Sequence, residues 1–293
     1  MSLLERIPEL ICPQCHGQFI ENGESSLECV LCHKEYPIIS GIPHLLDDDA
    51  TELSGEILVQ DRVAVEYEKL RYHDQFSSRY HRWWTSEMLK NLDLTGRILD
   101  NGCGIGLLDS FVENDRLVGF DISSVMLSYA SAHVSNLVLG NCQALPFADS
   151  SFDLVICRSL LHHLQEPQKA VSEISRILVP RGKITLADTN TSMLSYLPRV
   201  IAKRGEHFSE DHKNMSLSYL KEIIEPCFKI IDFKYFGYVA YPIIGFPDLV
   251  KVFQYLPFKK TFYHLLMAID RLLSHTPILS KQSWGIIIKA EKR

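Results

Sequence analysis

The sequence predicts an α/β fold, a doubly wound parallel sheet with helices on both faces, preceded by a small cysteine-rich module. A predicted buried strand at residues 97–101 leads into the glycine-rich turn 102–106, and a second predicted strand ends at Gly119-Phe120-Asp121. Strand-like and helix-like segments then alternate as far as residue 188, as they do in βαβ units. Two Cys-x-x-Cys pairs near the N-terminus mark the separate module.

The N-terminal module is defined by Cys12, Cys15, Cys29 and Cys32. These cysteines form two knuckles separated by residues 16–28, which is the spacing of a tetrahedral structural zinc site. Because all four ligands would be thiolates, no coordination position is open, and we expect the metal to serve folding and not catalysis. We expect the two histidines that follow the knuckles, His16 and His33, to face solvent.

The segment after the second knuckle, Glu35–Leu46, completes a pattern that resembles the Trm112-like zinc ribbons, small modules known as partners of methyltransferases. The resemblance implies a ribbon over residues 1–48 fused to a larger domain at 49–293. The run Asp47-Asp48-Asp49 is interpreted as a solvated linker between them. A module this small buries little apolar surface, so we expect chelation to unfold it while the larger domain stays folded.

Residues 50–94, before the first strand of the core, are predicted to be helical. The pattern over 56–92 indicates two helices. The positions expected to be buried are Val63, Val65, Leu70, Trp83, Trp84, Met88 and Leu89.

The core domain is assigned to residues 95–240 and 282–293. Polar side chains stand at or just past the ends of its predicted strands: Asp100, Asp121, Asn141 and Arg158. Parallel strands end at one edge of a sheet, so we expect these residues to lie together where open α/β sheets bind ligands. The predicted strands are 97–101, 116–121, 136–139, 153–158 and 182–188, and the predicted helices are 106–112, 123–132 and 167–178.

The glycine spacing distinguishes between two kinds of cofactor. Gly102, Gly104 and Gly106 follow one another as Gly-x-Gly-x-Gly, and residue 107 is Leu, so the third glycine of a dinucleotide motif is missing. Asp100, directly before the turn, suits a ligand with an ammonium group better than a pyrophosphate. Asp121, at the end of the second strand, suits the hydroxyls of a ribose.

The stretch from Asp100 to Gly106 resembles the Asp-x-Gly-x-Gly-x-Gly signature of class I S-adenosylmethionine-dependent methyltransferases of the type 11-like group. Three further segments resemble that family in the same order: Gly140–Val155, Leu160–Leu164 and Leu178–Ile184. In the last of these, Arg181 stands where the family usually carries a glycine. The resemblance covers roughly residues 95–190 and implies a Rossmann-like, seven-stranded, doubly wound sheet.

The resemblance implies that the helices of residues 50–94 form a lid over the cofactor, with Tyr67 as a candidate lid residue and simple packing of Tyr67 as the alternative. The resemblance also implies that S-adenosylmethionine is the cofactor and which residues bind it. It places Asp100 near the ammonium of the methionyl part, Asp121 at the ribose, and Ile122 and Met126 beside the adenine. Asn141 stands where the family usually has Asp. The complete set of expected cofactor-binding residues is Asp100, Gly102, Cys103, Gly104, Asp121, Ile122, Met126, Asn141, Cys142 and Arg158.

The acceptor side of the expected reaction is defined only by candidates. Methyl transfer from a sulfonium is an in-line displacement, so the protein aligns the acceptor and removes any acceptor proton. His163, which follows the fourth strand, and His207, in a polar loop after the fifth, are candidate bases because imidazole titrates near neutral pH. The acceptor is expected to be a small, apolar molecule methylated on O or C.

The resemblance implies that the C-terminal part closes the sheet with an antiparallel pair of strands. Residues 189–228 are expected to be mainly helical, with one helix at 216–224, followed by a strand at 229–240 and a last strand at 284–290. Between the strands, 241–281 is an insertion with apolar residues at helical spacing beside Lys259, Lys260 and Arg271. A helix packed on the sheet or in a dimer contact is one reading; a wall for an apolar substrate or a peripheral membrane contact is the other.

Composition limits the other function classes. The chain has 293 residues and a formal net charge of −6, and residues 1–50 carry nine acidic but only two basic side chains. An acidic N-terminal module disfavours nucleic acid as a partner. The alternatives considered are an rRNA guanine methyltransferase and a non-catalytic subunit that binds the donor. With no visible signal peptide and no uncharged run long enough to span a bilayer, we expect a cytoplasmic protein; its oligomeric state is left open.

Overall fold

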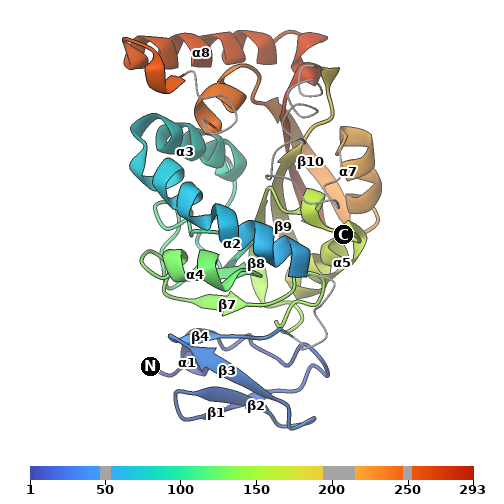
Figure 1. Ribbon diagram of the computed structural model, residues 1–293. Helices are drawn as coiled ribbons and strands as arrows, with labels where there is room; N and C mark the ends of the chain where they lie inside the picture. Colours follow the sequence, from blue (N-terminus) through green and yellow to red (C-terminus); the bar gives the residue numbers. More distant parts are fainter. Residues whose placement is uncertain (47–53, 194–214, 247–252) are drawn as a thin grey trace.

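The computed structural model describes residues 1–46, 54–193, 215–246 and 253–293. The chain forms two sheets, a four-stranded antiparallel sheet at the N-terminus and a seven-stranded sheet behind it. Figure 1 shows the small sheet at one end of the molecule and helix α8 at the other. Among the described residues, no helix combines the length and the apolar character needed to cross a membrane.

The N-terminal sheet is the cysteine module. It begins with α1 (Leu3–Arg6), whose N-cap Ser2 and N3 residue Glu5 form a reciprocal capping box. The β1–β2 hairpin brings the two knuckles together, since the first precedes β1 and the second follows the end of β2. Strand order is β1-β2-β3-β4, with bounds Phe19–Asn22, Ser26–Cys29, Glu35–Ile39 and Ile42–Pro43.

The large sheet has the order β10-β11-β9-β8-β5-β6-β7. The five strands from β9 to β7 are parallel, and β11 is antiparallel to both β9 and β10. This is the expected doubly wound, Rossmann-like sheet with an antiparallel pair at one side. The strand bounds are β5 Ile98–Asn101, β6 Leu117–Asp121, β7 Leu137–Leu139, β8 Phe152–Arg158, β9 Leu178–Thr189, β10 Phe228–Phe236 and β11 Gly285–Lys292.

Helices cover both faces of this sheet, which explains why the central strands β5 and β6 are buried throughout. One apolar cluster joins α5 (Pro167–Ile177) and α7 (Leu217–Ile224) to the sheet, and a second joins α3 (Gln75–Leu89), α4 (Ser124–Ala130) and α8 (Lys259–Ser274) to the opposite face. The other helical segments are α2 Ser54–Glu68, the π-helical turn Lys69–His73, and short turns at Leu161–His163, Tyr241–Gly245, Phe253–Tyr255 and Leu279–Gln282.

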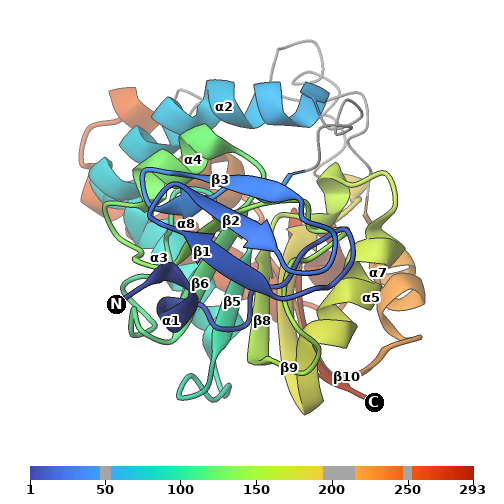
Figure 2. The same ribbon diagram turned by 90° about the horizontal axis from the view of Figure 1, so that it is seen from below.

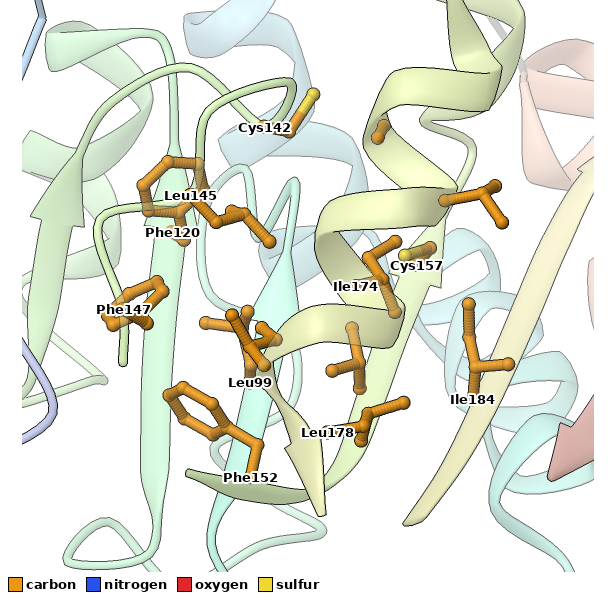
Figure 3. Close-up of a cluster of buried hydrophobic side chains, with 14 of the residues drawn as sticks. Leu99, Phe120, Cys142, Leu145, Phe147, Phe152, Cys157, Ile174, Leu178 and Ile184 are labelled. Carbon is orange, nitrogen blue, oxygen red and sulfur yellow. The ribbon is translucent and has the colours of Figure 1, made fainter. Parts of the chain in front are cut away.

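The N-terminal module is not an isolated unit. Its Leu10, Phe19 and Tyr36 belong to the same apolar cluster as Phe120 and Phe147 of the large domain. Figure 2 shows the module lying against the large domain. Figure 3 shows residues of the cluster that belong to the large domain, among them Phe120, Leu145 and Phe147. That chelation leaves the larger domain folded stays a prediction, but unfolding the module would expose the apolar side chains that it now covers.

Backbone and ionic contacts join the two parts as well. The Leu45 amide donates to the Leu139 carbonyl at the edge strand β7 (2.8 Å), and the Ile11 amide donates to the Pro146 carbonyl (3.0 Å). Arg97 forms a two-pronged ion pair with Glu9, with Nε to Oε1 at 2.7 Å and Nη2 to Oε2 at 3.1 Å. The module thereby covers the edge of the sheet next to the expected cofactor loop.

Several predicted elements need correction. The segment predicted as a helix at 106–112 consists of turns, because Gly104 and Gly106 adopt positive φ angles of 53° and 79° and prevent a regular helix from starting there. The strand predicted at 229–240 ends at Phe236. Val65 is exposed, not buried, because α2 packs through a narrow face that includes Val63 and Ala64. Leu70 and Trp83, which follow that helix in the chain, are only half-buried.

Candidate functional site

The candidate site lies at the carboxyl ends of the parallel strands. Asp100 on β5 lies opposite Gly119 of β6 and Ile156 of β8, and Asp121 ends β6 opposite Leu139 of β7. The chain leaves β5 toward β6 on one side, while β8 flanks β5 on the other. This is the topological switch point at which open α/β sheets bind ligands.

The glycine turn is tied to the second strand by hydrogen bonds. Gly102 adopts a φ of 79°, a conformation that favours glycine, and its amide and that of Cys103 both donate to the Phe120 carbonyl. The Gly104 amide donates to Asp121 Oδ2 at 2.8 Å, and the Ser123 amide donates to Oδ1 at 3.0 Å. The turn and the Asp121 carboxylate therefore form one rigid unit at the strand ends.

Asp100 is a buried carboxyl group with unusual surroundings. It is 1% exposed, and among the described residues neither carboxylate oxygen accepts a hydrogen bond. Burial raises its pKa to about 7, with the Asp121 charge adding to the effect and the Arg158 charge opposing it. Burial likewise raises the pKa of Asp121, against the hydrogen bonds that it accepts. A cationic ligand group beside Asp100 would supply the missing hydrogen bonds and favour the ionised form.

The remaining expected cofactor residues surround these two carboxyl groups. Met126 is buried on α4, with its sulfur 4.0 Å from the position that a side chain on Gly104 would take, and Ile122 is half-buried before that helix. The Asn141 side-chain oxygen accepts from the Gln143 amide at 2.9 Å and so shapes the loop after β7. The Arg158 guanidinium lies 4.6 Å from the ring centroid of Trp84. Cys103 and Cys142 are both buried, and burial raises the pKa of Cys142 to about 12.

Helix α2 covers this edge of the sheet, as Figure 1 shows. Its Val63 and Ala64 pack against Ile105, Leu107 and Met126 in a separate apolar cluster, and Tyr67 packs partly buried against the same group. Beyond the helix, the Tyr72 hydroxyl donates to the Gly106 carbonyl at 2.6 Å. The lid predicted for residues 50–94 is thus joined directly to the glycine turn.

Two histidines after β8 lie next to acidic residues from distant parts of the chain. His163 Nδ1 lies 2.9 Å from Glu56 Oε1 on α2, and His162 Nδ1 lies 2.7 Å from Asp188 Oδ1 at the end of β9. Burial alone would raise the pKa of Asp188, but His162 and the Thr189 amide hold it below the ordinary value. The other candidate base, His207, lies outside the described residues.

Sequence reasoning missed Glu56, Asp188 and His162 as members of this group. The signal for Asp188 was available, because it stands at the end of a predicted parallel strand, as Asp100 and Asp121 do. Glu56 had no such signal, since its place depends on how α2 docks over the sheet. His163 and Glu56 are 107 positions apart in the chain, and no periodic pattern connects them.

The four module cysteines form the second candidate site. Their sulfur atoms all lie within 4.8 Å of one another, with Cys12 and Cys32 at 3.7 Å and Cys15 and Cys29 at 3.3 Å. Tetrahedral zinc with Zn–S bonds of about 2.3 Å separates its ligands by about 3.8 Å, so the four sulfurs fit such an ion. His16 and His33 are exposed, as predicted, and the φ angles of 58° and 56° show that both knuckles turn in the same way.

Comparison with known families matches the central part of the chain. Residues 99–186 match the family described as "Methyltransferase domain". An uncharacterized methyltransferase from Schizosaccharomyces pombe is 31% identical over 38% of this chain and 48% of its own length. A demethylmenaquinone methyltransferase from Lactococcus lactis is 30% identical over 44% and 56%, and a malonyl-[acyl-carrier protein] O-methyltransferase from Hahella chejuensis is 33% identical over 33% and 38%. The chain spans about half the length of the curated relatives it matches.

Solved structures share the fold at low sequence identity. An S-adenosylmethionine-dependent methyltransferase from Thermotoga maritima superposes with a TM-score of 0.54 and 18% identity, covering 80% of this chain and 99% of that one. A chain from the Haloferax volcanii complex of the Trm112 methyltransferase activator with a methyltransferase gives a TM-score of 0.54 and 16% identity over 79% and 96%. The large domain therefore has a Rossmann-like methyltransferase fold.

Proposed function

We propose that this chain is an S-adenosylmethionine-dependent methyltransferase that methylates O or C of a small, apolar acceptor. The observation that carries the proposal is the pair of buried carboxyl groups at one sheet edge. Asp100 lacks hydrogen-bond partners among the described residues, and Asp121 is fixed by the glycine turn. S-Adenosylmethionine presents an ammonium group and a ribose diol, which are the two groups that these carboxylates would bind.

The residues beside Asp100 match the rest of the methionyl group. Arg158 would pair with its carboxylate. The ammonium and the carboxylate of the donor would then each face a protein group of opposite charge, Asp100 and Arg158. Ile122 and Met126 would face the adenine, and the loop at Asn141 would close over its edge. When bound, the donor supplies an electrophilic methyl group, and the protein's contribution is to hold it in line with the acceptor.

Donor binding is tested by calorimetry with S-adenosylmethionine and with its demethylated product. The protein should bind both, and Asp121→Asn should weaken binding by about one to two orders of magnitude, given roughly 1.5–3 kcal/mol for a hydrogen bond to a charged group. Asp232→Asn, an exposed carboxyl group on β10, is the matched control and should leave the affinity unchanged. Failure of the unaltered protein to bind either compound would refute the proposal.

On the acceptor side, we infer that His163 is the general base. Its Nδ1 faces Glu56 Oε1 at 2.9 Å, an arrangement in which the carboxylate holds the ring and Nε2 takes the acceptor proton. The neighbouring histidine, His162, is the comparison residue for this role, since it is buried and held by Asp188. The competing hypothesis is that the general base is His207, in the segment 206–212.

This role is tested once an acceptor is found by screening small molecules with isotopically labelled donor. The relatives named for demethylmenaquinone and malonyl-[acyl-carrier protein] suggest the first compounds for the screen. His163→Ala should lower turnover roughly 10²- to 10⁴-fold at unchanged donor affinity, the usual contribution of a general base. Glu56→Gln should lower turnover less and shift its pH profile. Unchanged turnover in His163→Ala, with a loss in His207→Ala, would assign the base to His207.

We also propose that the cysteine module binds one structural zinc ion. The closeness and chemistry of the four sulfurs support this, and the presence of four thiolates excludes an open catalytic position. Metal analysis of purified protein should give one zinc per chain. Cys32→Ser should reduce that value, whereas Cys227→Ser, outside the module, should not.

A further inference from the structure

Helix α8 lies at the end of the molecule opposite the cysteine module, as Figure 1 shows. Its Leu265 and Leu272, two helical turns apart and so on one side of the helix, are both exposed, and Leu272 is 71% exposed. Large apolar side chains near both ends of the helix are exposed too. Phe258, at its N-cap, is 80% exposed, and Tyr255, Ile278 and Leu279 are exposed as well. Exposed apolar side chains gathered on one helix in this way mark an interaction site.

The orientation of α8 is fixed by its buried side. Tyr263 and Leu266 lie in the apolar cluster of the sheet face. Asp270, also buried, accepts hydrogen bonds from the backbone amides of Tyr238, Val239 and Ala240 at 2.7–3.0 Å. Rotating the helix to bury Leu265 and Leu272 would break these bonds and expose Tyr263, so the outward apolar face is a stable feature of the fold.

Basic side chains surround this face. Lys259 and Lys260 begin the helix, Arg271 lies beside Leu272, and Lys281 follows Leu279. The one acidic residue of the segment 253–281 is Asp270, which is buried. The exposed charges of this segment are therefore positive, although the formal net charge of the whole chain is −6. Among the described residues, none of these four cations takes part in an ion pair.

The outward face of α8 thus offers apolar side chains with basic ones beside them, the combination that suits an anionic headgroup joined to an acyl chain.

We propose that the α8 face docks on an anionic phospholipid surface, with the apolar side chains inserted and the basic ones against the headgroups. A second copy of the chain fits this face poorly, because a twofold contact through α8 would bring the basic rims of both copies together. The inference does not depend on the proposed methyl transfer, since lipid binding is measured without donor or acceptor.

The test is flotation of the full chain with vesicles of phosphatidylcholine alone or mixed with phosphatidylglycerol. We expect binding to the anionic vesicles, weakened by high salt. Lys259→Ala combined with Lys260→Ala should weaken binding roughly 25-fold, at about fivefold per basic side chain. Leu272→Glu should weaken it roughly tenfold or more, because an inserted apolar side chain is lost.

Leu58→Glu is the matched control, because it makes the same change at a 64% exposed position on α2. It should bind the vesicles like the unaltered chain, and circular dichroism should show all variants folded. Absence of binding to anionic vesicles, or equal binding by Leu272→Glu, would overturn the proposal. So would a dimer that Leu272→Glu dissociates in a chain that does not bind vesicles, since the face would then be an interface between copies.

Discussion

Replacing Asp100 with Asn should make the ligand-free protein more stable while abolishing donor binding. The Asp100 carboxyl is buried and, among the described residues, without hydrogen-bond partners, and burial raises its pKa from 3.8 to about 7. Asn has nearly the same shape and polarity as the neutral carboxyl group but cannot ionise. It keeps the packing of the site and removes the free-energy cost of a buried charge.

The magnitude follows from proton linkage. Because the pKa is higher in the folded state than in the unfolded chain, the stability that the neutral carboxyl provides is fully present below about pH 4 and is lost as the pH rises to 7. At about 1.4 kcal/mol per pKa unit, the loss amounts to about 4 kcal/mol at pH 7 and about 2 kcal/mol at pH 5. Asp100→Asn should recover these amounts.

Urea unfolding followed by circular dichroism at pH 7 and pH 5 measures the difference, and calorimetry with S-adenosylmethionine measures binding. We expect the stability gain to halve between the two pH values and donor binding to disappear at both. Asp232→Asn, an exposed carboxyl group, should change the free energy of unfolding by less than about 0.5 kcal/mol. An Asp100→Asn protein that is no more stable than the unaltered chain at pH 7 would refute the assignment of Asp100 as a buried, strained charge.

Three further predictions concern the same structure. Donor affinity should fall roughly fivefold from pH 7 to pH 6, since the ionised share of a carboxyl group with a pKa of about 7 falls from half to about a tenth; a flat calorimetric profile would contradict this. Arg97→Ala should lower the free energy of unfolding in urea by about 3 kcal/mol, because it leaves the mostly buried Glu9 without its ion-pair partner. Arg116→Ala, which breaks an exposed pair, should lower it by less than about 0.5 kcal/mol. Equal costs would argue against close packing of the module on the large domain. Removing zinc with a chelator should speed amide hydrogen exchange in the loop 139–148, because the module bonds to both ends of it; exchange confined to residues 1–46 would show that the two parts are independent.

Most of the sheet could be predicted from the sequence because its strands carry local signals. Ile98–Asn101 begins with two apolar residues and ends at a glycine turn, and Leu117–Asp121 is apolar up to its final carboxylate. Each gave a strand within one or two residues of the prediction. The failures have local causes too. The helix predicted at 106–112 did not form, because the same glycines that shape the turn prevent a regular helix from starting there.

The candidate site was predicted in part for a related reason. Asp100, Asp121 and Arg158 stand at the ends of parallel strands, so the strand assignment alone brought them to one edge. Glu56 was missed because its position depends on the docking of α2. The packing of the module on the large domain was missed because its apolar side chains gave no sign of which surface they would meet.

The sequence by itself determined the α/β fold, the edge at which Asp100 and Asp121 meet, and the pairing of the two cysteine knuckles. These features follow from chain neighbours and from the rule that parallel strands end together. The tertiary structure alone decided that Glu56 faces His163, that the module shares a core with Phe120 and Phe147, and that one face of α8 is left in solvent. Each of these depends on the packing of surfaces distant in the chain, which is set by shape and burial and leaves no periodic trace in the sequence.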